Sequence, residues 1–308
     1  MSSTPMSVPC VAPAAPEGKA AAAIPSTAER TRSLRESTPP FTRRDAGGYT
    51  LGVINAVPIL ATQQMPPDTT KVQRDVAEMG AALGETSERL AMLAEGNGSG
   101  REDDGTFWIK ASGKSMATGN PADLVQVRFE PILAALEEDL DDTAVRERLD
   151  ASRVDPTAPR PSVETFMHAV LLALPGIRYV AHTHPEALLA LLCTDRAREE
   201  AGRRYFPDEV VLCGPESPYV PYVDPGLTLA RTIRDTLAGR EMPRTIWLEN
   251  HGLIAIGETT GQCIGATRMA EKAARIRAMG ATRPLSEADV ARIGGRPDEH
   301  HRQRQLWK

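Results

Sequence analysis

The sequence lacks the features that mark membrane, secreted and nucleic-acid-binding proteins. None of its apolar runs approaches the about 18 residues that a membrane-spanning helix needs, and its N-terminus has no compact apolar segment like that of a signal peptide. The 308 residues include 36 Lys and Arg against 41 Asp and Glu, so no basic excess favours nucleic acid or an anionic membrane. We therefore expect a cytoplasmic protein that acts on a small molecule.

Cysteine is also scarce, and its spacing excludes a disulfide framework. The four cysteines are far apart in the chain and form no CxxC pair: Cys10, Cys193, Cys213 and Cys263. We expect them to be reduced thiols that lie mostly in the core.

Residues 1–70 contain few of the aromatic side chains that nucleate a core, and Pro, Ala, Ser and Thr dominate them. We interpret this segment as disordered. Its Ser and Arg content resembles a transit peptide, but Glu17, Glu29 and the absence of an amphipathic apolar stripe disfavour that reading. Residues 71–308 show a continuous pattern of helices and short strands without an internal repeat, which is the size of one large α/β domain.

Within this domain, apolar periodicity predicts the elements that surround the polar motifs. Helices are expected over residues 72–94, 165–174 and 261–279, and strands over residues 106–111 and 124–129. Between the first helix and the first of these strands lies the glycine-rich segment Glu95–Gly100.

Three of the six histidines fall in two short segments that end β-rich runs. His182 and His184 are two residues apart after Tyr179, so in an extended chain they project to the same side. His251 ends a second run that begins at Thr245, and Gly252 permits a close turn after it. Three imidazoles leave one coordination position open, which is typical of catalytic rather than structural zinc. The alternative is that these are core or surface histidines without a metal.

Taken together, these motifs resemble the class II aldolase/adducin family of metal-dependent sugar-phosphate aldolases and epimerases. The resemblance covers about residues 72–281 and is carried by Gly96-Asn97-Gly98-Ser99, Ala111-Ser112-Gly113, Pro161-Ser162-Val163-Glu164 with His168, His182-Thr183-His184-Pro185, and Asn250-His251-Gly252 with Gly257. It implies a three-layer α/β/α sandwich with a mixed, largely antiparallel sheet. It also implies a homotetramer with sites near subunit interfaces.

The resemblance further implies roles for individual residues. His182, His184 and His251 hold a divalent ion, for which we expect Zn²⁺, with Mn²⁺ or Co²⁺ as alternatives. Glu164 is the catalytic carboxylate that takes and returns the substrate proton. For an isolated glutamate at the start of a helix, the alternative role is stabilisation of the helix dipole. His168, four residues later, is assigned to packing or to hydrogen bonding around the site rather than to the metal.

A phosphate cradle is implied at Asn97, Ser112, Gly113, Lys114 and Ser162, where backbone N–H groups and hydroxyls bind the anion and Lys114 adds a charge. Val163 departs from the family pattern, because many members carry a second hydroxyl residue there. The sequence also departs from the family pattern at the proton donor. Some family aldolases use a tyrosine that follows the histidine pair, and no tyrosine in this region matches it cleanly. Tyr222 is our candidate for this role, with a structural role as the alternative.

The sequence therefore predicts a metal-dependent aldehyde-lyase. The reaction would cleave or form a carbon–carbon bond in a small hydroxy-ketone sugar, expected to be phosphorylated, through a metal-stabilised enediolate. Epimerisation, dehydration and decarboxylation can use the same site and stay open. A different alternative is an adducin-like interaction module without catalysis, which the complete histidine triad and Glu164 disfavour.

Overall fold

The computed structural model describes residues 69–299 and 301. The expected disordered segment, residues 1–70, lies outside this range except for Thr69 and Thr70. Within the described residues, the strands form one seven-stranded sheet in the order β3-β2-β1-β4-β7-β6-β5. The strands are β1 (Asn97–Arg101), β2 (Thr106–Lys110), β3 (Leu124–Arg128), β4 (Tyr179–Thr183), β5 (Tyr219–Val220), β6 (Thr245–Leu248) and β7 (Gly252–Gly257).

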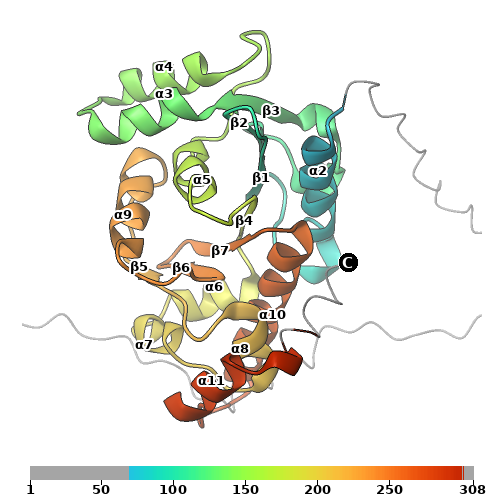
Figure 1. Ribbon diagram of the computed structural model, residues 1–308, viewed down its shortest axis with the longest axis vertical. Helices are drawn as coiled ribbons and strands as arrows, with labels where there is room; N and C mark the ends of the chain where they lie inside the picture. Colours follow the sequence, from blue (N-terminus) through green and yellow to red (C-terminus); the bar gives the residue numbers. More distant parts are fainter. Residues whose placement is uncertain (1–68, 300, 302–308) are drawn as a thin grey trace, which may run out of the picture. The chain divides into compact units, whose positions relative to one another are not determined.

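Neighbouring strands are antiparallel except at one edge of the sheet. Only β5 runs parallel to its neighbour β6. The expectation of a mixed, largely antiparallel sheet is therefore confirmed. At the centre, β4 pairs with β1 on one side and with β7 on the other, so the end of β4 lies between two strands that are distant in sequence (Figure 1).

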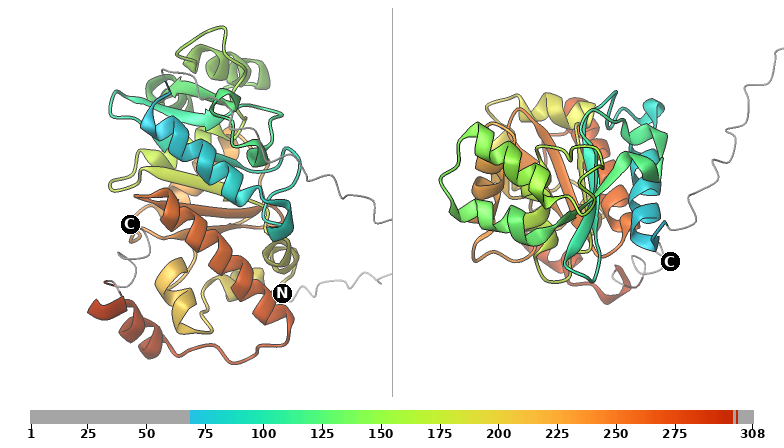
Figure 2. Two further views of the ribbon diagram at one scale, coloured as in Figure 1. Left: turned by 90° about the vertical axis from the view of Figure 1, so that its right-hand side faces the viewer. Right: turned by 90° about the horizontal axis from the view of Figure 1, so that it is seen from above.

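Helices cover both faces of the sheet and complete the three-layer α/β/α sandwich (Figures 1 and 2). Apolar contacts place α3, α4, α5 and α9 on one face, and α2, α6, α7 and α10 with the end of α8 on the other. The α-helices are α2 (Lys71–Leu83), α3 (Phe129–Ala134), α4 (Asp142–Ser152), α5 (Thr165–Leu172), α6 (Glu186–Leu192), α7 (Ala197–Ala201), α8 (Pro207–Cys213), α9 (Leu227–Leu237), α10 (Thr260–Ala278) and α11 (Glu287–Gly294). Short 3₁₀ turns occur at Thr86–Glu88, Met116–Thr118, Pro121–Asp123 and Ala135–Glu137.

The alternation of side chains along β7 divides its residues between the two cores. Ile254 and Ile256 pack against α5 and α9, whereas Leu253 and Ala255 face the layer of α10. Most buried residues of α10 are small, which lets this helix lie close to the sheet: Cys263, Ala266, Ala270, Ala273 and Ala274, with Thr267 and Glu271 also buried. Figure 2 (left) looks onto α2 and α10 where they cross in front of the strands.

The expected first helix, residues 72–94, is too long by about three turns. The helix α2 ends at Leu83, and Gly84 follows it because a β-carbon there would lie 2.4 Å from the backbone nitrogen of Ala117. Leu90 belongs to the core but lies in the following loop, where its carbonyl oxygen accepts a hydrogen bond from the backbone of His184 at 2.9 Å. Leu93, which appeared to extend the apolar stripe, is 89% exposed.

The glycine-rich segment before β2, expected to be a phosphate-binding loop, is largely the strand β1. Its glycines are needed because α2 packs directly on this strand. A β-carbon on Gly98 would lie 2.9 Å from the terminal methyl group of Met79, and one on Gly100 would lie 2.7 Å from Val72 and Val76. The small residues therefore serve helix packing rather than loop flexibility.

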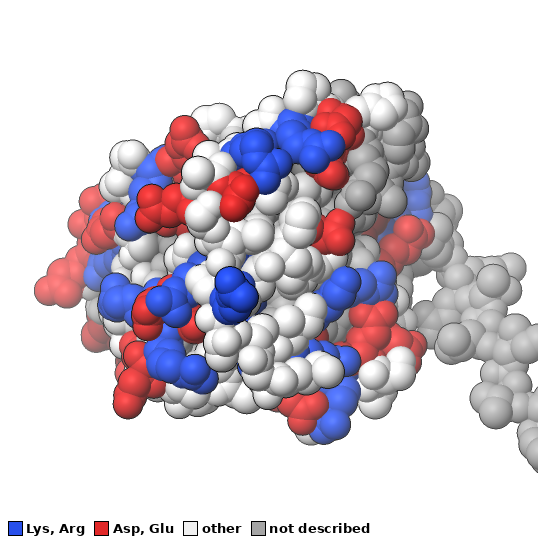
Figure 3. Space-filling view, turned by 90° about the horizontal axis from the view of Figure 1, so that it is seen from below, with Lys and Arg blue, Asp and Glu red and all other residues white. Residues whose placement is uncertain are grey.

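No helix among the described residues is both long and apolar enough to span a lipid bilayer. Lys and Arg alternate with Asp and Glu on the face shown in Figure 3, so this face presents no continuous field of one sign.

Candidate metal centre

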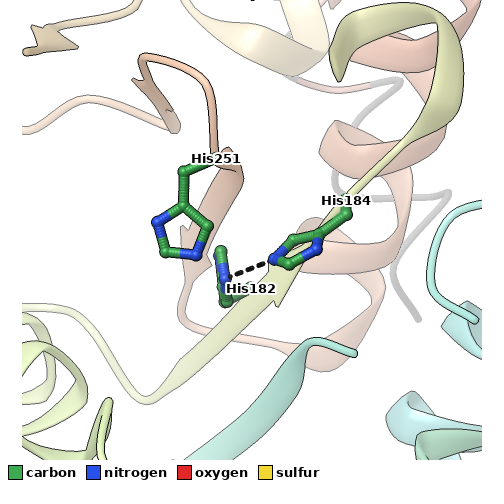
Figure 4. A group of neighbouring side chains, drawn as sticks. All are labelled: His182, His184 and His251. Carbon is green, nitrogen blue, oxygen red and sulfur yellow. Dashed lines mark hydrogen bonds between the residues drawn. The ribbon is translucent and has the colours of Figure 1, made fainter. Parts of the chain in front are cut away.

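The structure brings the three histidines together at one end of the central strands (Figure 4). His182 lies in β4, His184 follows the last residue of that strand, and His251 lies in the turn between β6 and β7. The pairing of Thr183 with Leu253 places the turn beside the end of β4. An extended β4 and a tight turn are therefore sufficient to converge three imidazoles from positions about 70 residues apart.

The turn that carries His251 differs from the sequence interpretation in one respect. The left-handed residue is Asn250, with φ of 50°, and Gly252 is already the first residue of β7. Gly252 is needed for a different reason, because a β-carbon there would lie 2.5 Å from the carbonyl oxygen of Thr183. The missing side chain lets β7 approach β4 closely beside the histidines.

The three imidazole rings form a compact, nearly symmetric group. Their centroids are separated by 4.9 Å (His182 and His184), 4.8 Å (His182 and His251) and 5.1 Å (His184 and His251), with interplanar angles of 69°, 74° and 70°. The Nε2 atoms of His182 and His184 are 3.1 Å apart. In a tetrahedral site with Zn–N bonds of about 2.0–2.1 Å, two ligand nitrogens lie about 3.3 Å apart. The spacing therefore fits a small divalent ion.

His182 is held in the protonation state that a metal ligand requires. Its ring is fully buried, and Nδ1 lies 3.0 Å from the carbonyl oxygen of Leu253, an acceptor to which only an N–H group can bond. Nε2 is therefore left with a free lone pair directed toward His184. Burial lowers the pKa of His182 to about 3, so the ring is neutral near neutral pH.

Glu164 completes the group. It immediately precedes α5, a helix that packs on one face of the sheet. Its Oε1 lies 3.4 Å from Nε2 of His182 and 3.2 Å from Nε2 of His251. Glu164 is the N-cap residue of α5, but its side chain makes no capping hydrogen bond and is instead directed toward Asn97 and the histidines. Burial alone would raise the pKa of Glu164, but His182, His251 and a hydrogen bond from Asn97 outweigh it and hold the pKa below its ordinary value.

A cation would satisfy an atom that the protein leaves without a partner. Oε1 of Glu164 is buried and accepts no hydrogen bond within the described residues, whereas Oε2 accepts one from Asn97 at 2.6 Å. Leaving a buried carboxylate oxygen unsatisfied is costly. Three converging imidazole nitrogens with this negatively charged oxygen beside them suit a divalent ion such as Zn²⁺.

The residues expected to bind phosphate lie next to this group. An antiparallel bridge between Ala111 and Pro161 joins the Ser112–Lys114 turn to the segment that contains Ser162. Ser112 and Gly113 are exposed, Gly113 has a left-handed φ of 73°, and the Oγ atom of Ser162 lies 3.4 Å from the amide nitrogen of Asn97. Ser112, Gly113 and Ser162 thus lie near one another, whereas Asn97 is buried in β1 with its amide engaged by Glu164 and His168, which disfavours its expected role in binding phosphate.

The lysine of the expected cradle is engaged elsewhere, and a second lysine was missed. Lys114 pairs with Asp123 at 2.9 Å, which reduces the charge it can offer to an anion. Lys110 is buried at the end of β2, and its ammonium group donates to the carbonyl oxygens of Ala94 (3.1 Å) and Lys114 (2.6 Å). It therefore ties together the two loops beside the site. The signal in the sequence that could have identified Lys110 was a lysine at the end of an otherwise apolar strand.

Tyr222, the candidate proton donor, lies on an exposed loop after β5 and is 52% exposed. Its hydroxyl group donates to Asp224 at 3.3 Å, and its backbone N–H donates to Glu249 at 2.8 Å. The hydroxyl is thus held by a residue of its own loop and the backbone by the β6–β7 turn, and a role as proton donor stays a prediction.

Comparison with known proteins gives the family context of this site. The sequence model of the family called class II aldolase and adducin N-terminal domain matches residues 74–278. A Bacillus subtilis (strain 168) protein, named as the uncharacterized oxidoreductase YuxG, is 31% identical over 169 residues, or 54% of this chain and 23% of that protein. The chain thus spans less than a quarter of the length of this relative.

Solved structures with the same fold include three with high coverage. The N-terminal class II aldolase domain of a conserved Thermoplasma acidophilum protein is 25% identical with a TM-score of 0.55, covering 71% of this chain and 97% of that one. YgbL from Klebsiella pneumoniae, a candidate aldolase, epimerase or decarboxylase, is 22% identical with a TM-score of 0.58 (72% and 97%). An L-fuculose 1-phosphate aldolase is 17% identical with a TM-score of 0.56 (73% and 95%). The family model, which matches well over half of the chain, shows that this protein belongs to the class II aldolase and adducin N-terminal domain family.

Proposed function

We propose that this protein is a metal-dependent aldehyde-lyase that cleaves or forms a carbon–carbon bond in a small hydroxy-ketone sugar. The observation that carries the proposal is the position of Glu164. One of its oxygens is anchored by Asn97, and the other is buried without a partner within 3.4 Å of two of the three converging histidines. A divalent ion held there supplies Lewis-acid stabilisation of the negative charge that develops beside a ketone.

The protein's own residues account for the proton chemistry. An ionised Glu164 accepts a proton through Oε1, because Oε2 is already occupied by the amide of Asn97. The same carboxyl group can return that proton when the reaction runs in the other direction. Burial of His182 and Glu164 excludes bulk water from this side of the site, which strengthens electrostatic interactions with the substrate.

A phosphorylated substrate is proposed from the turn at Ser112 and Gly113. The groups that support this are the exposed Ser112 and Gly113, with a left-handed φ at Gly113, and the hydroxyl of the nearby Ser162. The backbone N–H groups of Ser112 and Lys114 already donate to the carbonyl oxygens of Arg160 and Ala111, so the hydroxyls and the N–H of Gly113 would bind the anion. Zn²⁺ is the metal we propose, with Mn²⁺ and Co²⁺ as alternatives, because imidazole ligands accept all three. The homotetramer implied by the family resemblance remains a prediction.

Two measurements on the same purified protein test the proposal. Elemental analysis should find about one divalent ion per chain, and a screen of phosphorylated and unphosphorylated ketoses should release an aldehyde. Chelation should abolish the release, and added Zn²⁺ should restore it. Epimer, dehydrated product or carbon dioxide in place of an aldehyde would overturn the lyase assignment but keep the metal site.

Histidine variants connect the activity to the triad. Replacing His182, His184 or His251 by Ala removes one proposed ligand, so metal content and turnover should fall together. His301 is exposed and far from these positions in sequence, so His301→Ala is the matched control and should retain both properties. A wild-type protein that binds no metal would contradict the proposal and favour a non-catalytic, adducin-like module.

A further inference from the structure

Four buried polar side chains form a continuous chain of hydrogen bonds from β1 to the start of α5. The Oγ atom of Ser99 lies 2.6 Å from Nδ1 of His168, Nε2 of His168 contacts Oδ1 of Asn97, and Nδ2 of Asn97 lies 2.6 Å from Oε2 of Glu164. Ser99 and His168 are 0% exposed, Asn97 is 2% exposed, and Glu164 is 8% exposed. Because water is largely excluded, each of these groups depends on its protein partner.

The ionised carboxylate of Glu164 determines which atom donates in each of these hydrogen bonds. An ionised carboxylate can only accept hydrogen bonds, so Asn97 must present its NH₂ group to Glu164. The carbonyl oxygen of Asn97 then faces His168 and needs a donor there, which places the proton of His168 on Nε2. Nδ1 of His168 is left as an acceptor, and the hydroxyl group of Ser99 donates to it.

We propose that His168 is a positioning residue for Glu164: as the Nε2–H tautomer it locks the amide of Asn97, which in turn anchors Oε2 and leaves Oε1 as the oxygen that faces the histidines. His168 and Glu164 lie on the same turn of α5, since the backbone N–H of His168 donates to the carbonyl oxygen of Glu164 at 3.2 Å. The backbone of α5 and the hydrogen-bonded series of side chains therefore both fix the position of the Glu164 carboxylate.

Without His168, the amide of Asn97 could turn and present its oxygen to the carboxylate. That orientation would place two acceptors together and release Oε2. Burial lowers the pKa of His168 to about 4, although the charge of Glu164 opposes this, so the ring carries a single proton near neutral pH. Only a ring with a single proton has one donor nitrogen and one acceptor nitrogen, as this arrangement requires.

The tautomer can be measured in the metal-free wild-type protein. Long-range ¹H–¹⁵N correlation spectra of histidine-labelled protein, with His168 assigned by its loss in a variant, should show a protonated Nε2 and an unprotonated Nδ1 from pH 6 to pH 8. Ser99→Ala should weaken this preference. An Nδ1–H tautomer, or a doubly protonated ring, would overturn the proposal. This measurement needs neither substrate nor metal, so it stands independently of the proposed function.

A second measurement uses turnover and therefore rests on the proposed function. His168→Met keeps the approximate volume but removes the donor, whereas His168→Gln can still donate to Asn97. We expect His168→Met to lower kcat by on the order of 10-fold, with KM and metal content changed less than about 2-fold, and His168→Gln to recover most of kcat.

Thr267→Val is the matched control for burying an apolar group, because Thr267 is fully buried in α10 and bonds only within that helix. It should leave kcat unchanged. Equal kcat in wild type, His168→Met and His168→Gln would reduce His168 to a packing residue and overturn the proposal. A wild type without metal or turnover would instead contradict the proposed function.

Discussion

Gly252 and Thr183 are in such close contact that no side chain fits between them. A β-carbon on Gly252 would lie 2.5 Å from the carbonyl oxygen of Thr183, 2.8 Å from Cδ2 of His184 and 3.3 Å from Cε1 of His182. The backbones of β4 and β7 thus meet directly at the point where the imidazoles converge. The geometry of the candidate metal centre depends on this contact as much as on the histidines themselves.

Gly252→Ala should therefore damage the site without removing any proposed ligand. The added methyl group forces β7 away from β4, which we expect to lower the free energy of unfolding by about 1–3 kcal/mol and to lower the metal content. Denaturant unfolding and elemental analysis measure the two effects. Gly202→Ala is the matched control, since a β-carbon there would have its nearest neighbour 3.6 Å away. Equal metal content in both variants would contradict this account.

The sequence predicted those parts of the fold and site that depend on local periodicity. His182 and His184 share a side because the chain is extended through Tyr179–Thr183, and apolar periodicity predicted α10 to within about one residue at each end. These two features need only neighbours within a few positions of the chain. The sheet type and the grouping of the three histidines depend on distant pairing, and they were predicted only through the resemblance to a family.

Features that depend on distant contacts could not be predicted in this way. The helix over residues 72–94 was extended too far because Leu90 and Leu93 fit its period, although the close approach of Ala117 ends α2 at Gly84. The role of Gly98 and Gly100 as packing positions depends on α2. Likewise, the hydrogen bond from Asn97 to Glu164 joins residues 67 positions apart, so its partner is visible only in the folded chain.

Phosphate recognition gives a further prediction. Ser112→Asp introduces a negative charge into the exposed turn beside Gly113, so KM for a phosphorylated substrate should rise by roughly 10-fold or more through charge repulsion. KM for an unphosphorylated analogue and the metal content should change little. Steady-state kinetics with the matched pair of substrates provides the comparison. Equal effects on both substrates would remove Ser112 from the proposed anion site.

The buried His168 makes the stability of the metal-free protein depend on pH. Its folded-state pKa of about 4 lies below the value of about 6.5 in an unfolded chain. Above about pH 6.5 its contribution to stability is fully present, and as the pH falls toward 4 the unfolded state takes up a proton that the folded state does not. Wild type should therefore lose on the order of 3 kcal/mol relative to His168→Gln across this window. Parallel stability curves for the two proteins in denaturant titrations would refute the prediction.

The central claim is that Glu164 performs the proton transfer at a metal site built by His182, His184 and His251. Glu164→Gln preserves the size of the side chain, but its amide cannot accept the substrate proton. The most direct test measures metal content and turnover of this variant and of wild type on the same preparations. We predict near-normal metal content with turnover reduced by a factor on the order of 100 or more. Near-normal turnover in Glu164→Gln would contradict the account.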